Sequence, residues 1–267
     1  MALSPTAPFD AIAATYDEEF SNSLVGRAQR TAVWQELDRT FIAGQCVLEI
    51  NCGTGEDAVY LAKRGVHVVA LDASQAMIRR ARQRVGPANL ENRVCLDVMS
   101  SEELGRLGGE SIFDGLLSNF SGLNCVEDLR GIAHQMARLL KPGAPALTCI
   151  FGRFCAWEMA WYLGSGNFRK AFRRMRRVVE SSVGHDTSVT VYYHSLRSIR
   201  KAFKPYFTLE GWRGIGVAVP PSYVEGVASR FPGALAAASR VDNALGHFPI
   251  WRNLADHQLL VFRRRDP

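Results

Sequence analysis

An α/β fold, with a mostly parallel sheet covered by helices on both faces, is predicted by three features of the sequence. Short apolar runs alternate with amphipathic, helix-like segments from about 46 to 151. A glycine-rich turn, NCGTG at 51–55, follows the first apolar run. The chain has 267 residues, of which 47% are hydrophobic and 22% charged, so it is long enough for one sizeable domain of this kind.

Seven strands are expected, and the last is predicted to run antiparallel to the others. The apolar runs place them at 46–50, 67–72, 93–97, 113–118, 145–151, 206–219 and 257–265. Helices are expected between them at 55–64, 74–84, 101–107 and 126–140, and Lys141-Pro142-Gly143 is a stop signal for the last of these. In such sheets the ligand lies beyond the carboxyl ends of the strands.

We expect one domain, 1–267, divided into four parts. Two helices at 9–20 and 24–41 form an N-terminal helical cap (1–42). The core follows at 43–151. A lid insertion after the fifth strand covers 152–205, with a helical stretch at 153–180, a strand at 188–195 and a short helix at 196–203. The rest of the core, 206–267, is helical between its two strands.

Positive charge is concentrated in the insertion. The chain carries a net charge of +6, and 152–205 alone holds eleven basic residues against three acids, so the excess points to one surface. The run RKAFRRMRR at 169–177 is compatible with a solvated helix face, a site for an acidic substrate or a nucleic-acid contact. A solvated face is the commonest outcome for such a run, and its arginines spread around much of the helix circumference.

Membrane insertion and secretion are not expected, and the predicted location is the cytoplasm. The longest apolar run, 143–152, is of strand length, and the N-terminus lacks a basic leader followed by an apolar block. Six cysteines are scattered without a CxxC pair, which favours buried free thiols in a reducing compartment over disulfides or a zinc site.

The turn at 51–55 favours a polar or anionic ligand, because glycines allow the backbone to approach a ligand closely. A dinucleotide fingerprint, G-x-G-x-x-G, counted from Asn51 has glycine only at Gly53, since Asn51 and Glu56 occupy the other two positions. A different spacing is counted from the acidic strand residue Glu49. In that count the turn reads x-x-G-x-G, with its glycines at Gly53 and Gly55, and both positions fit.

That pattern resembles motif I of the class I S-adenosylmethionine (SAM)-dependent methyltransferases, E/D-x-G-x-G-x-G. The likeness continues in VVALDAS (68–74), CLDVM (95–99), LLSNFSGLN (116–124) and LLKPGAPALTCIFG (139–152), so it covers roughly 40–151. The resemblance implies a Rossmann-like fold, SAM as methyl donor with S-adenosylhomocysteine (SAH) as product, and no metal.

The resemblance also implies roles for residues at the strand ends. Asp72 corresponds to the acid that binds both ribose hydroxyls, and Asp97 to the acid that meets the adenine amino group. Glu49 lies near the amino-acid end of the cofactor, where we favour a role in shaping the site, and it can instead cap backbone N–H groups of its turn. Asp72 has the alternative of an N-cap for the helix that starts near Ser74.

Asn51 departs from the family pattern, which has glycine at this position. Asparagine tolerates the left-handed backbone region, so we expect the turn to survive and SAM binding to persist. Its side chain is a candidate partner for the cofactor carboxylate or for its own backbone.

The N-terminal segment FDAIAATYDEEF resembles a cofactor-covering segment of small-molecule methyltransferases of the ubiquinone-biosynthesis type, which places Tyr16 near the methionine moiety. A guanidinium matches the geometry of the methionine carboxylate, so Arg27 or, preferably, Arg30 is a candidate partner for it. The alternative is helix packing and surface charge. The full set of predicted cofactor-binding residues is Tyr16, Arg30, Glu49, Asn51, Cys52, Gly53, Gly55, Asp72, Ala73, Met77, Asp97, Val98, Asn119 and Phe120.

The acceptor is much less determined than the donor, because methyl transfer requires only an aligned nucleophile, exclusion of water and, for a protonated nucleophile, a base. A small-molecule acceptor is the main hypothesis, and no catalytic residue is assigned. Candidates to line the acceptor pocket are Trp157, Trp161 and Tyr162, with packing of the lid on the core as the alternative. His185 and His194 are candidate bases, with a surface or hydrogen-bonded structural role as the alternative.

Two other functions stay open at this point. A nucleic-acid methyltransferase is suggested by the basic insertion and the isoelectric point near 9.1. Against it, SNFS at 118–121 lacks the Asn/Asp-Pro-Pro-aromatic box of amino-methylating enzymes of that class. The third possibility is a SAM-binding protein without catalysis. The oligomeric state is expected to be a monomer or a homodimer.

Overall fold

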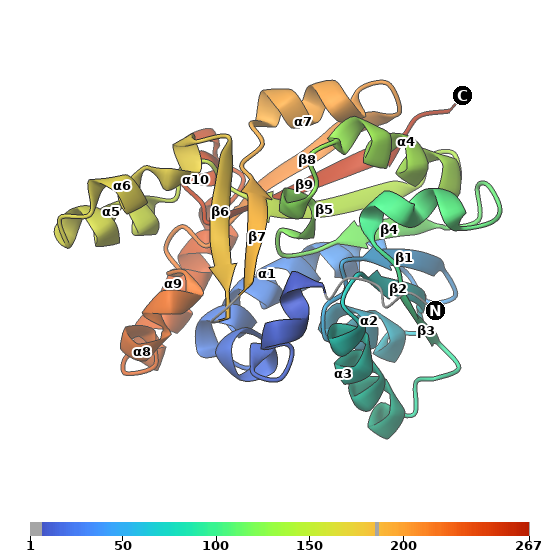
Figure 1. Cartoon of the computed structure of the whole chain (residues 1–267), viewed down its shortest axis with the longest axis horizontal. Coiled ribbons are helices and arrows are strands. Elements are labelled where there is room, and N and C mark those ends of the chain that lie inside the picture. The colour runs from blue at the N-terminus through green and yellow to red at the C-terminus, as the bar shows by residue number, and fades with distance from the viewer. Residues whose placement is uncertain (1–6, 185–186, 267) are drawn as a thin grey trace.

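The computed structural model describes residues 7–184 and 187–266, and it has a seven-stranded sheet with helices on both faces (Figure 1). The strand order is β3-β2-β1-β4-β5-β9-β8, and only β9 runs antiparallel to its neighbours β5 and β8. The strands of this sheet are β1 (Cys46–Ile50), β2 (His67–Asp72), β3 (Val94–Val98), β4 (Gly115–Ser118), β5 (Pro145–Phe151), β8 (Phe207–Ile215) and β9 (His257–Arg264). The predicted fold class is therefore confirmed.

The helices follow the predicted alternation with strands. They are α1 (Leu24–Thr40), α2 (Glu56–Lys63), α3 (Gln75–Val85), α4 (Leu129–Leu139), α5 (Ala156–Gly164), α6 (Phe168–Ala171), α7 (Leu196–Phe203), α8 (Glu225–Ala228), α9 (Pro232–Leu245) and α10 (Pro249–Asn253). Shorter 3₁₀ or π turns are η1 (Pro8–Ile12), η2 (Asp17–Ser21), η3 (Gly86–Ala88), η4 (Ser101–Arg106), η5 (Gly122–Cys125), η6 (Arg173–Met175) and η7 (Ser222–Val224). No helix among the described residues is long and apolar enough to cross a bilayer.

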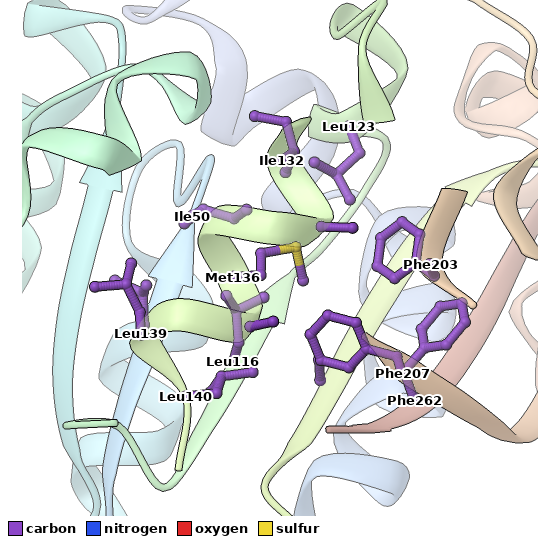
Figure 2. Close-up of a cluster of buried hydrophobic side chains, with 14 of the residues drawn as sticks. Ile50, Leu116, Leu123, Ile132, Met136, Leu139, Leu140, Phe203, Phe207 and Phe262 are labelled. Carbon is purple, nitrogen blue, oxygen red and sulfur yellow. The ribbon is translucent and has the colours of Figure 1, made fainter. Parts of the chain in front are cut away.

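Two hydrophobic clusters, one on each face, hold the sheet between its helices. Successive residues of β1 contribute to opposite clusters: Leu48 belongs to one and Val47 to the other. The first cluster is formed with α4 and α7, and Figure 2 shows Met136 of α4 among these side chains. In the same cluster the rings of Phe203 and Phe262 stack with their centroids 4.5 Å apart. The second cluster is formed with α1, α2 and α3.

Helix α7 lies in the segment predicted as a lid, yet it packs in the core. Ile199 and Phe203 are only 2% and 1% exposed and belong to the cluster with α4. The part of 152–205 that stands outside the sheet layers is therefore α5, α6, η6 and a separate two-stranded hairpin, β6 (Val178–Val183) with β7 (Thr187–Tyr192). In Figure 1, α5 and α6 project from one end of the molecule, and the hairpin lies in front of the N-terminal segment.

The sequence-based helix assignments were wrong in three places. The helix expected at 9–20 is two short turns, η1 and η2, and the one expected at 101–107 is the 3₁₀ turn η4. The helical stretch expected at 153–180 ends before β6, because 178–183 pairs antiparallel with β7, from Val178 opposite Tyr192 to Val183 opposite Thr187. That pairing depends on residues further along the chain, so local periodicity did not reveal it.

Candidate functional site

The turn after β1 adopts the left-handed backbone conformation at three residues. Asn51, Gly53 and Gly55 have φ values of 58°, 55° and 75°. A Cβ atom at Gly55 would lie 2.9 Å from Cβ of Ala81 on α3, so glycine is needed there for α2 and α3 to pack together. At Gly53 a Cβ would meet nothing within 4 Å, so the backbone faces open space. The turn is thus shaped to present its backbone to a ligand at Gly53.

Asn51 uses its side chain to tie the ends of neighbouring strands together. Its Nδ2 donates to Oγ of Ser101 at 2.9 Å, and its Oδ1 accepts from Oγ of Ser118 at the end of β4 at 3.2 Å. A Cβ at Gly122 would fall 2.3 Å from Cβ of Asn51, so Gly122 makes room for this side chain. The asparagine is held by other side chains, and its own backbone is not among its hydrogen-bond partners.

Asp72 holds the same turn from the end of β2. Its Oδ2 accepts the Gly53 N–H at 2.8 Å and its Oδ1 accepts the Ser74 N–H at 2.9 Å. Burial raises the pKa of this carboxyl above its ordinary value, and the two backbone N–H donors oppose that shift. The N-cap of α3 is Ser74 itself, whose Oγ accepts the Met77 N–H at 3.0 Å.

A cavity of about 300 Å³ opens between this turn, the strand ends and the N-terminal segment. Ten of the fourteen predicted cofactor-binding residues line it, which are Tyr16, Arg30, Asn51, Cys52, Gly53, Asp72, Ala73, Met77, Asn119 and Phe120. The lining also includes Phe9, Asp57, Ser101 and Val126, which are not among the fourteen predicted residues. The cavity lies at the carboxyl ends of β1, β2 and β4, where the topology predicts it.

Four predicted residues do not line the cavity. Gly55 serves the packing of α2 on α3. Asp97 and Val98 end β3 with their side chains exposed, and Oδ1 of Asp97 accepts the Val98 N–H at 2.8 Å. Glu49 of β1 is only 1% exposed and is not in the lining.

Glu49 is a buried carboxylate with an unsatisfied oxygen. Its Oε2 atom has no hydrogen-bond partner among the described residues, so it does not cap the backbone through that atom. Burial raises the pKa of Glu49 well above its ordinary range, the Asp57 carboxylate raises it further, and Arg30 offsets part of the shift.

A buried polar network closes one end of the cavity, and Asp57 is its centre. Oδ2 of Asp57 accepts from Arg30 and from Nδ2 of Asn119 at 2.9 Å, and Oδ1 accepts from Nε1 of Trp34 at 2.6 Å. The guanidinium of Arg30 also lies 4.8 Å from the ring centroid of Phe120. Arg30 is therefore fixed by an ion pair, whereas Arg27 is exposed and outside the cavity lining.

The N-terminal segment is fastened over the cavity by two aspartates. Asp10 accepts hydrogen bonds from Oγ of Ser74 and from the Ala76 N–H at the start of α3. Asp17 accepts from Oγ1 of Thr54 at 2.6 Å and pairs with Arg84 at 2.7 Å. Tyr16 lies between these contacts in the cavity lining, and burial raises its pKa to about 12.

The β6–β7 hairpin reaches the cavity from the other side, since Val189 of β7 is part of its lining. Asn124 anchors the hairpin to the sheet: its Nδ2 donates to the Tyr192 carbonyl at 2.8 Å, and its Oδ1 accepts the Phe151 N–H at 2.9 Å. His194 is buried with its Nε2 at 2.9 Å from the Val126 carbonyl, and burial lowers its pKa.

The other candidates for an acceptor pocket lie away from the cavity lining or outside the described residues. Nε1 of Trp157 donates to the Ala218 carbonyl at 3.2 Å. Trp161 is 44% exposed, and its ring centroid lies 6.5 Å from that of Tyr223. The ring centroid of Tyr162 lies 6.1 Å from that of the same Tyr223. His185 lies outside the described residues.

Two arginines of the run at 169–177 are structural. Arg174 is 5% exposed and pairs with Glu158 at 2.8 Å and with Asp256 at 2.7 Å, while Arg173 pairs with Glu158 at 2.7 Å. His257 and Arg174 outweigh the opposing effect of burial and lower the pKa of Asp256. The run is thus not uniformly solvated.

The cysteines are free, as predicted, but they are not all buried. Cys52, Cys149 and Cys155 are buried, whereas Cys95 on the edge strand β3 is exposed. Among residues 7–184 and 187–266, no group of three or more histidine, cysteine or acidic side chains is placed to hold a metal ion.

Known proteins share both the sequence pattern and the architecture. Residues 47–143 match the family model of a methyltransferase domain. The chain is 30% identical over 161 residues to an uncharacterized methyltransferase of Mycobacterium bovis, over 60% of this chain and 78% of that protein. This chain belongs to the class I SAM-dependent methyltransferase family.

A second curated relative is matched over less of its own length, and a solved structure shares the fold. This methyltransferase is 30% identical over 146 residues to a demethylmenaquinone methyltransferase of Clavibacter sepedonicus, over 55% of this chain and 57% of that protein. The match therefore spans little more than half the length of that relative. A phosphoethanolamine N-methyltransferase of Haemonchus contortus, solved with phosphomonomethylethanolamine and S-adenosylhomocysteine, shares the fold with a TM-score of 0.60 at 18% identity, over 97% of this chain and 58% of that one.

Proposed function

We propose that this methyltransferase transfers the methyl group of SAM to a small-molecule acceptor enclosed between the strand ends and the N-terminal segment. The observation that carries the proposal is the cavity of about 300 Å³ at the turn after β1, where an open backbone at Gly53, the Asp72 carboxylate and the Arg30 guanidinium converge. The volume is at the lower end of those typical for small-molecule sites.

The residues of the cavity fit the chemical groups of SAM. Within residues 7–184 and 187–266, each oxygen of Asp72 accepts one N–H, so each keeps capacity to accept from a ribose hydroxyl. Nε of Arg30 is buried without a partner among the described residues, and the guanidinium suits a carboxylate. When bound, SAM supplies an electrophilic methyl group on a sulfonium sulfur.

The chain's own contribution is positioning and exclusion of water. The N-terminal segment is clamped by Asp10 and Asp17, and Val189 of the hairpin closes the opposite side. Apolar side chains, Phe9, Phe120 and Val126, form part of the wall. Such an enclosure aligns donor and acceptor and keeps water from competing as the nucleophile.

Two observations favour a small acceptor over a nucleic acid. Arg173 and Arg174 are occupied by Glu158 and Asp256, so the basic run offers fewer free cations than its sequence indicates. The Clavibacter relative is named for methylation of demethylmenaquinone, which is a small molecule. We infer that the acceptor is a small molecule, without assigning its identity.

The proposal is tested by following where the methyl group goes. The purified chain is incubated with methyl-labelled SAM and, separately, with a low-mass cell extract, total RNA and denatured protein. We expect SAH release and label only in the low-mass fraction, and the Asp72→Asn variant should lose at least about tenfold of the rate. Label in RNA or protein, or unchanged turnover in Asp72→Asn with folding intact, contradicts the proposal. Glu210→Gln, a surface carboxylate paired with Arg263, is the matched control.

A further inference from the structure

The end of the insertion carries a dense positive charge on a projecting element. We define the α5–α6 tip as residues 161–177, which include the end of α5, all of α6 and the turn η6. This segment holds six basic residues and no acid. In Figure 1, α5 and α6 extend away from the sheet, whereas the η6 end of the tip is held against it through Arg174, which pairs with Asp256 beside β9.

Large apolar side chains are exposed on the same tip. Phe168 is 66% exposed, Met175 48% and Trp161 44%, and Leu163 and Phe172 are exposed as well. An isolated exposed apolar residue needs no explanation, but five lie within 17 residues of one projecting element, and although Trp161 also contacts Tyr223, all five give the tip an exposed apolar surface. Exposing this surface to water is unfavourable, so it calls for a partner that covers it.

The charges divide into a structural pair and an outward-facing set. Within the tip, Arg173 and Arg174 form the structural pair, and their charges are neutralised by Glu158 and Asp256. The outward-facing set is exposed and forms no ion pair within the described residues; it consists of Arg169, Lys170, Arg176 and Arg177. The buried pairs hold the tip in place, and the outward-facing cations remain available to a partner.

We propose that the α5–α6 tip docks this chain onto the surface of an anionic lipid bilayer. Exposed aromatic and aliphatic side chains enter the boundary between headgroups and acyl chains, and lysine and arginine pair with anionic headgroups. Each basic residue near such a surface contributes about 1 kcal/mol. The tip combines both elements within one short segment.

Charge argues against a second copy of the chain as the partner. A two-fold symmetric contact through the tip would place its basic residues against the same residues of the other copy. A nucleic acid would neutralise the charge, but its phosphate backbone does not need exposed aliphatic side chains such as Leu163 and Met175. A bilayer uses both the charge and the apolar surface.

The docking surface is independent of the proposed methyl transfer, although the insertion connects the two. The hairpin that follows the tip contributes Val189 to the cavity lining. Docking would bring this cover of the cavity to the lipid surface. Failure of lipid binding would leave SAM binding unaffected, so the two proposals fail separately.

The test is flotation of the full chain with phosphatidylcholine vesicles that contain or lack phosphatidylglycerol. Binding is expected only with the anionic lipid and should weaken as salt screens the charges. The double variants Phe168→Ser with Phe172→Ser, and Lys170→Glu with Arg176→Glu, should each lower the partition coefficient about tenfold or more. Thermal unfolding and SAH binding check that each variant is folded.

Matched controls lie elsewhere on the surface. Ile42, between α1 and β1, is 66% exposed like Phe168, and Arg130 on α4 is exposed like Arg176. Ile42→Ser and Arg130→Glu should leave vesicle binding unchanged. Binding to neutral vesicles at equal strength, equal losses in the controls, or tip-dependent binding of a duplex RNA or of a second copy without binding to vesicles would each overturn the proposal.

Discussion

The core at 43–151 and the insertion at 152–205 position their charged side chains in different ways. In the core, Asp72 is the last residue of β2 and contacts the turn 19 residues earlier through the Gly53 N–H. In the insertion, Arg174 is held by Asp256, 82 residues further along the chain. The first arrangement follows from the order of parallel strands, whereas the second depends on how a distant segment folds back.

This difference explains why the strand ends of the core form most of the cavity, whereas two arginines of the insertion's basic run are held in structural ion pairs. Parallel strands bring their carboxyl ends, and the polar residues there, to one edge of the sheet. The position of a basic run is not fixed by strand order in this way. Its arginines become structural only where acidic side chains from other elements pair with them.

Replacing Arg174 by methionine should cost about 3–5 kcal/mol of unfolding free energy, because Glu158 and Asp256 are left buried without their partner. Urea unfolding at pH 7 measures the loss. Arg177→Met, at an exposed neighbouring position, should change stability by less than about 0.5 kcal/mol. Equal, small effects in both variants would show that the buried pairs do not hold the insertion.

The Arg174–Asp256 pair predicts that stability depends on pH. The pKa of Asp256 is lowered in the folded state, so its contribution is complete above the unfolded pKa of about 3.9 and is lost as pH falls through the folded value. The stability difference between the wild type and Arg174→Met should therefore be largest near neutral pH and shrink on acidification below about pH 4. A difference that grows on acidification would contradict this sign.

Replacing Gly122 by alanine should cost about 1–3 kcal/mol, because the new Cβ would lie 2.3 Å from Cβ of Asn51. The double variant with Asn51→Gly removes the side chain that clashes, so it should recover part of the loss. Asn51→Gly alone should cost about 1 kcal/mol through the lost contacts to Ser101 and Ser118. A double-mutant cycle by thermal unfolding measures the coupling, and strict additivity would contradict it.

Replacing Glu49 by glutamine should give the smallest change, about 1 kcal/mol, and in the stabilising direction. The folded state raises the pKa of Glu49, so the wild type binds more protons when folded and loses stability as pH rises through that range. The advantage of Glu49→Gln should grow as pH increases from about 4.5. Unfolding curves measured across pH check this trend. If the stability of Glu49→Gln relative to the wild type falls as pH rises, Glu49 is not a buried carboxyl group with a raised pKa.

Much of the core could be predicted from the sequence, because its information is local. The predicted bounds of β1, β2 and β5 coincide with the structure, and the left-handed conformation expected at Asn51 is present. Its side-chain partners, Ser101 and Ser118, could not be predicted, because they lie 50 and 67 residues away. Asp57 was missed for the same reason, since its partners Arg30, Trp34 and Asn119 come from other elements.

The edge strand β3 differs from β1 and β2, because its predicted site residue lies away from the cavity. Family resemblance places Asp97 against the adenine, but the side chain is exposed at the sheet edge and outside the cavity lining. The alternation of β3 is clear in the sequence, whereas the depth of a cavity beside an edge strand depends on the loops that follow, here 99–106.

Calorimetric titration of the chain with SAH measures whether the turn after β1 binds the adenosyl group. Saturable one-to-one binding is expected for the wild type and for Glu210→Gln, and Asp72→Asn should weaken it about tenfold or more, since a charged acceptor for the ribose hydroxyls is lost. No binding of SAH at millimolar concentration, or equal affinity in Asp72→Asn, would show that the cavity at Gly53 and Asp72 does not hold the methyl donor.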